Sequence, residues 1–117
     1  MSLILIIDDN PCVRTMLKYI LNNYQVLEAK DGTEGLNHLK KHKNIKLVIT
    51  DYQMPGVNGL EICKWVKKNR PQTAVILITA CNKIILGAHK LEVVHVFPKP
   101  FEDIDYILEQ IKRIMGG

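Results

Sequence analysis

The sequence has few cysteines, few aromatic residues and no long apolar run. It contains Cys12, Cys63 and Cys81, and phenylalanine, tryptophan and tyrosine together make up 6% of its residues. An odd number of isolated cysteines argues against a disulfide framework, so we expect a reducing, cytoplasmic compartment. The apolar N-terminal run Leu3–Ile7 is too short for a signal-peptide core or a membrane span. The sequence therefore argues against a secreted disulfide scaffold and against a membrane protein.

Length and charge indicate one folded domain without a nucleic-acid signature. The chain has 117 residues, of which 47% are hydrophobic and 24% charged, which is typical of a globular domain rather than a disordered one. We expect a single domain over residues 1–117. The net charge of +4 is mild, and no helix-turn-helix pattern accompanies the basic clusters Lys40–Lys46 and Lys64–Arg70. We interpret both clusters as solvated helix faces and expect no direct binding to nucleic acid.

Apolar segments alternate with helical patterns along the whole chain. The expected strands are Leu3–Ile7, Tyr24–Ala29, Ile45–Thr50, Ala74–Thr79 and Val93–Phe97. Helical patterns begin at Pro11 with Asp9 or Asn10 as cap, after the capping residues Asp31 and Asn58, weakly over Lys83–Leu91, and over Ile104–Met115. Such alternation with short connections predicts an open, mostly parallel α/β sheet with helices on both faces.

Polar side chains stand where four of these strands end. They are Asp8 and Asp9 after the first strand, Asp51 after the third, Thr79 after the fourth and Lys99 after the fifth. Parallel strands bring their carboxyl ends to one edge, where ligands of open α/β sheets bind. Three carboxylates at such short distances repel one another, and a bound divalent cation offsets this repulsion. Hard oxygen ligands without histidine or cysteine at ligand spacing favour Mg²⁺ or Mn²⁺ over zinc.

Asp51 is the candidate nucleophile of this edge. It lies between a strand and the Pro55-Gly56 loop, so we expect it to be the most exposed of the three carboxylates. A carboxylate can attack phosphorus in line and form an acyl phosphate, and the developing charge would meet the cation, the Lys99 ammonium and the Thr79 hydroxyl. Singly, each such residue at a strand end is more often a helix cap or a structural group. Together, the four strand ends indicate a site that handles a phosphoryl group.

At this point the motifs resemble the receiver domain of two-component response regulators. The resemblance rests on Asp8-Asp9, on LVITDYQMPGVNGLE around Asp51, on LITA at Thr79 and on FPKPF at Lys99, and it spans essentially the whole chain. It implies a flavodoxin-like (βα)5 fold with a parallel five-stranded sheet of order 2-1-3-4-5. It also implies a phosphoacceptor signalling domain rather than an enzyme, which takes a phosphoryl group onto Asp51 from the phosphohistidine of a histidine kinase or phosphotransfer protein.

The resemblance also implies a set of metal ligands. Asp9 would bind Mg²⁺ directly and Asp8 largely through water. Asp51 and the backbone carbonyl of Gln53 would complete the protein ligands. The side chain of Gln53 is in addition a candidate for tuning the attacking water, and hence the lifetime of the acyl phosphate.

Further residues would contact the phosphoryl group and carry the switch. The resemblance assigns both tasks to Thr79 and Lys99, and it implies that the Lys99–Pro100 peptide is cis, which would hold the lysine backbone in a tight turn. Pro98 stands beside the fifth expected strand. A proline is compatible with that strand if the strand lies at the edge of the sheet.

The switch region departs from the family pattern. Receivers usually place Tyr or Phe three residues before the lysine, and here Val96 stands there with His95 and Phe97 on either side. Because neighbouring residues of a strand face opposite sides, neither can simply substitute. We therefore expect phosphorylation with an atypical output surface, formed by the fourth helix, the fifth strand and the fifth helix. The same surface is a candidate homodimer contact.

Two other functions stay open at this stage. A binding-only pseudo-receiver would keep the fold without phosphotransfer, and the altered switch keeps this alternative alive. A Mg-dependent aspartyl-phosphate hydrolase, resembling the haloacid dehalogenase group, would need a second Asp two residues beyond the nucleophile. Gln53 stands at that position and cannot transfer a proton. The sequence therefore favours the signalling domain, with its cognate kinase and output undetermined.

Overall fold

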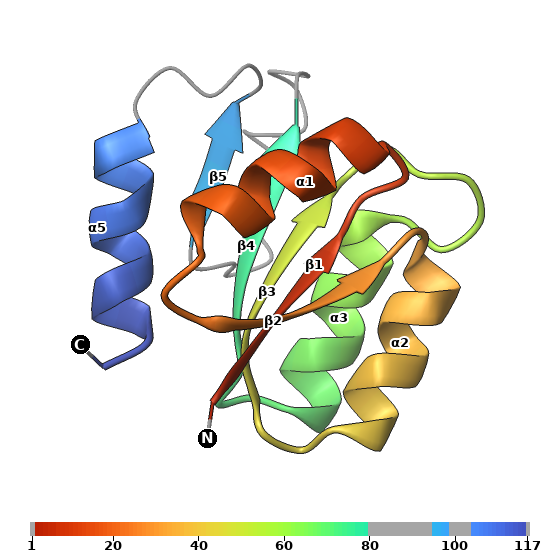
Figure 1. Cartoon of the computed structure of the whole chain (residues 1–117). Coiled ribbons are helices and arrows are strands. Elements are labelled where there is room, and N and C mark those ends of the chain that lie inside the picture. The colour runs from red at the N-terminus through yellow and green to blue at the C-terminus, as the bar shows by residue number, and fades with distance from the viewer. Residues whose placement is uncertain (1, 80–94, 99–103, 117) are drawn as a thin grey trace.

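A five-stranded parallel sheet forms the centre of the molecule. The computed structural model describes residues 2–79, 95–98 and 104–116. The strands are β1 (Leu3–Ile7), β2 (Gln25–Ala29), β3 (Ile45–Asp51), β4 (Ala74–Thr79) and β5 (His95–Pro98). They lie in the order β2-β1-β3-β4-β5, and every neighbouring pair is parallel (Figure 1). The predicted sheet and its order are confirmed.

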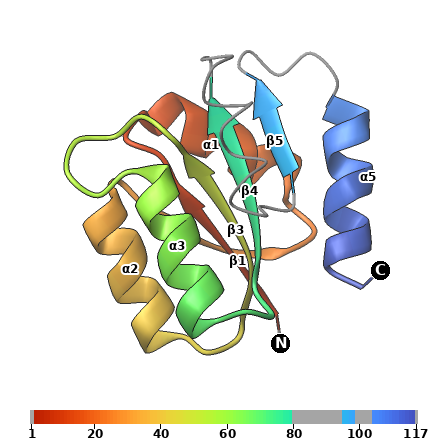
Figure 2. The ribbon, with the colours of Figure 1, turned by 180° about the vertical axis from the view of Figure 1, so that it is seen from behind.

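Helices cover both faces of this sheet. Those described are α1 (Pro11–Ile20), α2 (Gly32–Lys41), α3 (Gly59–Asn69) and α5 (Ile104–Ile114). Figures 1 and 2 show α2 and α3 on one face and α1 and α5 on the other. The weak helix expected over Lys83–Leu91 lies outside the described residues. Within the described part of the chain, no helix is long and apolar enough to cross a membrane.

The apolar run of β1 explains why both faces are covered. Leu5 and Ile7 pack into the core cluster that includes residues of α2 and α3, whereas Ile4 and Ile6 pack into the cluster with α1 and α5. All four side chains are fully buried. Alternate side chains of a strand point to opposite faces, so an uninterrupted aliphatic run is what a strand between two layers of helices requires.

Polar caps start three helices at the carboxyl edge of the sheet. The side chains of Asn10, Asp31 and Asn58 accept hydrogen bonds from the backbone N–H of Cys12, Glu34 and Glu61, respectively. Each cap satisfies a donor that the first turn of the helix cannot pair internally. Asn10 therefore caps α1, and the Asp9 side chain is not needed for that task.

The fifth strand lies at the edge of the sheet and ends one residue beyond the prediction. Its described part pairs with β4 from His95 to Pro98, and Pro98 is opposite Thr79. A proline has no N–H to donate to a ladder, so an edge strand is where it is tolerated. The strand β5 therefore ends at Pro98, one residue after the predicted end at Phe97.

Candidate functional site

Three carboxylates meet at the carboxyl ends of β1 and β3. One carboxylate oxygen from each of Asp8, Asp9 and Asp51 lies within 4.8 Å of the other two. The strand register accounts for this, because Ile7 pairs with Thr50 and the next residue of each strand is an aspartate. The structure thus brings together the acidic residues that the sequence placed on two different strands.

The exposure of these carboxylates differs from the prediction. Asp51 is only 7% exposed and Asp8 only 1%, whereas Asp9 is exposed. The expectation that Asp51 is the most exposed of the three is therefore wrong. The reason is that β3 continues through Asp51, which pairs with Ile78 of β4, instead of ending at Thr50.

The turn that carries Asp8 and Asp9 is held by several hydrogen bonds. The backbone N–H of Asp8 donates to the Ala29 carbonyl at 3.1 Å, which ties the end of β1 to the end of β2. The Asp8 carboxylate accepts from the Asn10 N–H at 2.9 Å. The Arg14 guanidinium donates to the Asp8 carbonyl at 2.7 Å. Asp9 follows directly, so its direction depends on the same turn.

The end of β3 is held by the start of α3. The Gly59 N–H donates to the Tyr52 carbonyl at 3.1 Å, and the Tyr52 N–H donates to the Ile78 carbonyl at 3.0 Å. The backbone at Gly59 passes so close to Asp51 and Leu77 that no larger residue fits without movement. Sequence reasoning missed Gly59, although a glycine directly after the Asn58 cap, where it lowers helix propensity, was a usable signal.

The loop between β3 and α3 follows the acidic cluster. Gln53 is exposed there and lines a shallow hollow of about 450 Å³ with Tyr52, Met54, Pro55 and Asn58. Gly56 turns this loop with a φ of 75°, a conformation that glycine adopts without steric cost. The assignment of the Gln53 carbonyl as a metal ligand and of its side chain as a tuning group stays a prediction.

The remaining predicted site residues lie at or beyond the ends of β4 and β5. Thr79 is the last residue of β4, one position past the Ile78 partner of Asp51, so its backbone reaches the same edge. Lys99 and Pro100 lie outside the described residues, and the expected cis peptide lies there too. Their roles at the site stay predictions.

The three predicted switch positions lie on β5. His95, Val96 and Phe97 pair with Ile76, Leu77 and Ile78 of β4. The fourth helix of the expected output and dimer surface falls on residues outside the description. The atypical switch and the homodimer contact therefore stay predictions as well.

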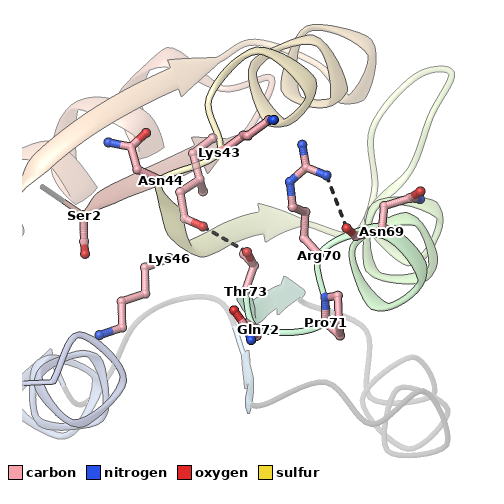
Figure 3. A pocket seen from close by; sticks show the side chains of 10 residues that line it. Ser2, Lys43, Asn44, Lys46, Asn69, Arg70, Pro71, Gln72 and Thr73 are labelled. Atoms are coloured by element: carbon pink, nitrogen blue, oxygen red, sulfur yellow. Dashed lines mark hydrogen bonds between the residues drawn. The ribbon is translucent and has the colours of Figure 1, made fainter.

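A second hollow lies where the strands begin, at the end of the sheet opposite the acidic cluster. The contacts of Arg70 in its wall are structural. About 470 Å³ in volume, the hollow is lined by Ser2, Lys43, Asn44, Ile45, Lys46, Asn69, Arg70, Pro71, Gln72 and Thr73 (Figure 3). The Arg70 guanidinium donates to the Leu39 and Asn69 carbonyls, each at 3.2 Å, and lies 5.5 Å over the Trp65 ring. Arg70 thus joins the C-terminal ends of α2 and α3. Trp65 lies beside it, in the C-terminal half of α3.

The acidic cluster fits a small, hard divalent cation. Mg²⁺ holds oxygen ligands about 2.1 Å away in an octahedron, so opposite ligands are about 4.2 Å apart. The three carboxylate oxygens lie within 4.8 Å of one another, so small side-chain movements or one intervening water complete such a shell. The donors are all carboxylates, which suit Mg²⁺ or Mn²⁺. Asp8, Asp9 and Asp51 are the residues that would hold the ion.

Two cysteines occupy contrasting environments. Burial raises the pKa of the Cys63 thiol to about 12, because α3 packs it into the core. Cys12 is exposed in the first turn of α1. Cys63 is therefore a packing residue, with no thiolate at neutral pH.

Comparison with known proteins agrees with this architecture. The family model of the response regulator receiver domain matches residues 4–112. The chain therefore belongs to the response regulator receiver domain family, whose members are signalling domains of two-component systems rather than enzymes in the ordinary sense. The predicted family and the flavodoxin-like receiver fold are confirmed.

Particular relatives cover nearly the whole chain. It is 34% identical to sporulation initiation phosphotransferase F of Bacillus subtilis over 116 residues, which are 96% of this chain and 92% of that protein. It is 32% identical over 120 residues to a chemotaxis protein CheY homolog of Campylobacter jejuni, covering 97% of this chain and 92% of the relative.

Solved structures of receivers superpose closely. The crystal structure of the response regulator TrrA from Thermotoga maritima, in complex with Mg²⁺ and BeF, matches with a TM-score of 0.87 at 31% identity over 97% of this chain and 99% of that one. The receiver domain of a signal transduction histidine kinase from Syntrophus aciditrophicus also has a TM-score of 0.87, at 27% identity over 100% of this chain and 92% of that one.

Proposed function

We propose that this receiver domain accepts a phosphoryl group on Asp51, with Mg²⁺ held by Asp8, Asp9 and Asp51. The observation that carries the proposal is the convergence of the three carboxylates within 4.8 Å at the end of β3. The similarity to a receiver solved with Mg²⁺ and BeF supports the choice of ion. The signal then passes to partners through a change of surface in this cytoplasmic domain.

The phosphoryl donor in this proposal is the phosphohistidine of a histidine kinase or of a phosphotransfer protein. A carboxylate oxygen of Asp51 attacks the phosphorus, the bond between phosphorus and the imidazole nitrogen breaks, and the imidazole leaves with a proton from solvent. The product is an acyl phosphate on Asp51 and an unphosphorylated histidine. The name of the Bacillus subtilis relative, a phosphotransferase, supports this reaction class.

The surroundings of Asp51 suit such a reaction. Its position at the end of β3, between Ile78 and Gly59, fixes the backbone and leaves the carboxylate little exposed. A fixed nucleophile needs little reorganisation to reach its attacking geometry. When bound, Mg²⁺ neutralises charge on the phosphoryl oxygens. We assign the remaining contacts to the Thr79 hydroxyl and the Lys99 ammonium.

The output half of the proposal concerns β5. Val96 stands where receivers usually carry the switch aromatic, so the phosphorylation signal would pass through a different set of contacts. Mapping amide chemical shifts with and without phosphorylation tests this. Shifts that follow an aromatic-type switch at residue 96 or its neighbours contradict the atypical output.

Acetyl phosphate tests the acceptor half without a kinase. With Mg²⁺ present, intact mass measurement should show a gain of one phosphoryl group in the wild-type chain and none in Asp51→Asn. A wild-type chain that gains no mass with Mg²⁺ present overturns the phosphoacceptor proposal and favours a binding-only pseudo-receiver. Asp51→Asn keeps the shape of the side chain, so it is a matched control.

A further inference from the structure

Arg14 joins the acidic turn to a neighbouring strand. It lies on α1, and its Nη1 donates to the Asp8 carbonyl at 2.7 Å while its Nε donates to the Glu28 carboxylate at 3.3 Å. Glu28 is on β2, where it pairs with Ile6 of β1. The Arg14 side chain is only 18% exposed, so this contact is partly shielded from water. The guanidinium thus spans α1, the end of β1 and β2.

Neither Arg14 nor Glu28 is a candidate metal ligand. Arg14 nevertheless contacts the turn that carries Asp8, and Glu28 in turn holds Arg14. Asp8 is held at its N–H by Ala29, at its carboxylate by Asn10 and at its carbonyl by Arg14. Of these three partners, Ala29 and Asn10 contribute backbone groups, whereas Arg14 contributes its side chain. Glu28 fixes the direction of that side chain, because a planar guanidinium can serve two partners in set directions at once.

We propose that Arg14, anchored by Glu28, is a positioning residue that presents Asp8 and Asp9 to the divalent cation. This inference rests on the proposed Mg²⁺ site and adds two residues to it. Residues that hydrogen-bond to metal ligands, without touching the metal, orient those ligands. Their loss lowers the affinity for the metal by about tenfold or more.

The sign of the effect separates positioning from plain electrostatics. A guanidinium close to a cation site repels the cation, so on charge alone its removal should tighten Mg²⁺ binding. A positioning role predicts that the removal of Arg14 weakens Mg²⁺ binding. Without the Arg14 contact the turn is less well fixed, and the carboxylates of Asp8 and Asp9 are less often in the geometry that binds the ion. Replacing Arg14 by a neutral residue therefore moves the affinity in opposite directions under the two explanations.

The decisive variant is Arg14→Gln, followed by Mg²⁺ titration of the full chain with backbone amide chemical shifts as the readout. We expect the Mg²⁺ dissociation constant to rise about tenfold. Arg14→Lys keeps the charge but loses the two-partner geometry, so we expect a smaller rise, of about threefold. An unchanged or lower dissociation constant in Arg14→Gln overturns the inference. If Arg14→Gln does not fold, Arg14→Lys decides: an unchanged constant there overturns it.

Lys18 supplies a matched control for the charge. Its Nζ lies 3.0 Å from the other oxygen of Glu28, and its side chain is 51% exposed, against 18% for Arg14. Lys18→Gln removes one positive charge from the same cluster and should leave Mg²⁺ affinity within about twofold, since exposed pairs contribute little. A loss as large as that of Arg14→Gln would mean that the hold on Glu28, not the contact with Asp8, sets the affinity, whereas tighter binding would show the effect of charge alone.

A double variant tests the anchor. Glu28→Gln should weaken Mg²⁺ binding by a few fold, and Arg14→Gln with Glu28→Gln should weaken it no more than Arg14→Gln alone, because both act through one contact. Fully additive losses contradict the anchoring role. In the metal-free chain with EDTA, amide hydrogen exchange at Asn10 should be faster in Arg14→Gln than in wild type.

These measurements do not require phosphorylation. If the wild-type chain binds Mg²⁺ but acetyl phosphate adds nothing to Asp51, the proposed function fails and the positioning role can still hold. If phosphorylation proceeds and Arg14→Gln binds Mg²⁺ as wild type does, the positioning role fails alone.

Discussion

Gly59 and Asp51 approach each other so closely that a Cβ atom on residue 59 would lie 2.5 Å from the Asp51 carbonyl oxygen. Gly59, the first residue of α3, thereby touches Asp51, which is the last residue of β3 and the proposed phosphoacceptor. A side chain at position 59 must push either the helix or the strand end away. The geometry of Asp51 therefore depends on a residue that has no chemistry of its own.

Gly59→Ala should destabilise the domain and misplace Asp51. We expect the free energy of unfolding to fall by about 1–3 kcal/mol, as for other overpacked sites, and the rate of phosphorylation by acetyl phosphate to fall at least severalfold. Urea unfolding and intact mass measure the two effects.

Gly56→Ala is the control for Gly59→Ala. Gly56 has a φ of 75° and open space around its Cα, so alanine there costs about 1–2 kcal/mol through backbone strain alone. Equal phosphorylation rates in Gly59→Ala and wild type would show that the close approach does not position Asp51.

Gln53→Ala should change the lifetime of the acyl phosphate. Gln53 is exposed two residues after Asp51, where its amide can orient an attacking water. If it does so, its removal slows the decay of phosphorylated protein by a few fold, as followed by intact mass over time. Equal decay rates in wild type and Gln53→Ala remove this role.

Arg70→Ala should weaken the fold without affecting the phosphoacceptor. The change removes hydrogen bonds to two helix-terminal carbonyls and the contact with Trp65, so we expect a loss of about 1–3 kcal/mol in the free energy of unfolding. Trp65 fluorescence should shift, while phosphorylation by acetyl phosphate stays as in wild type.

Lys68→Ala is the matched surface change for Arg70→Ala. Lys68 is exposed in the last turn of α3, and its loss should change stability by no more than about 0.5 kcal/mol. A strong loss of phosphorylation in Arg70→Ala would contradict the purely structural role of Arg70.

The two described cysteines should differ in reactivity. At pH 8, iodoacetamide should alkylate Cys12 and leave Cys63 unmodified in the folded chain, because burial raises the pKa of Cys63 to about 12 and blocks access. Peptide mass mapping distinguishes the two sites, and urea-unfolded protein serves as the control in which both react. Rapid labelling of Cys63 in folded protein would contradict its burial.

The same pKa gives a pH dependence. The unfolded thiol ionises near its ordinary value of 9.0, whereas the folded thiol keeps its proton up to about 12. The unfolded state therefore binds fewer protons between these values, and the Cys63 contribution to stability falls as pH rises through this window. Cys63→Ala should show a shallower loss of stability there than wild type. Equal slopes would contradict the raised pKa.

Local patterns predicted most of the fold because they depend on neighbours in the sequence. The aliphatic run of β1 and the caps Asp31 and Asn58 could be read from spacing alone, and the structure has them as expected. For α1 the spacing left Asp9 and Asn10 as alternatives, and the structure has Asn10 as the cap. The convergence of Asp8, Asp9 and Asp51 followed from parallel strands that end at one edge.

Contacts between distant segments could not be read in this way. The burial of Asp51 depends on one further residue of pairing with β4 and on Gly59 above it. The link from Arg14 to Glu28 depends on the register that places Glu28 beside Ile6. A strand register is fixed by the packing of both faces, and a single sequence does not give the distances that result.

The position of the phosphoryl group within the chain tests the role of Asp51 most directly. After reaction with acetyl phosphate and Mg²⁺, borohydride reduction converts an acyl phosphate into an alcohol, and peptide mapping finds the reduced residue. We expect reduction at Asp51, and only when Mg²⁺ is present. Reduction at Asp8 or Asp9, or no reduced residue in a folded chain that binds Mg²⁺, would contradict this role.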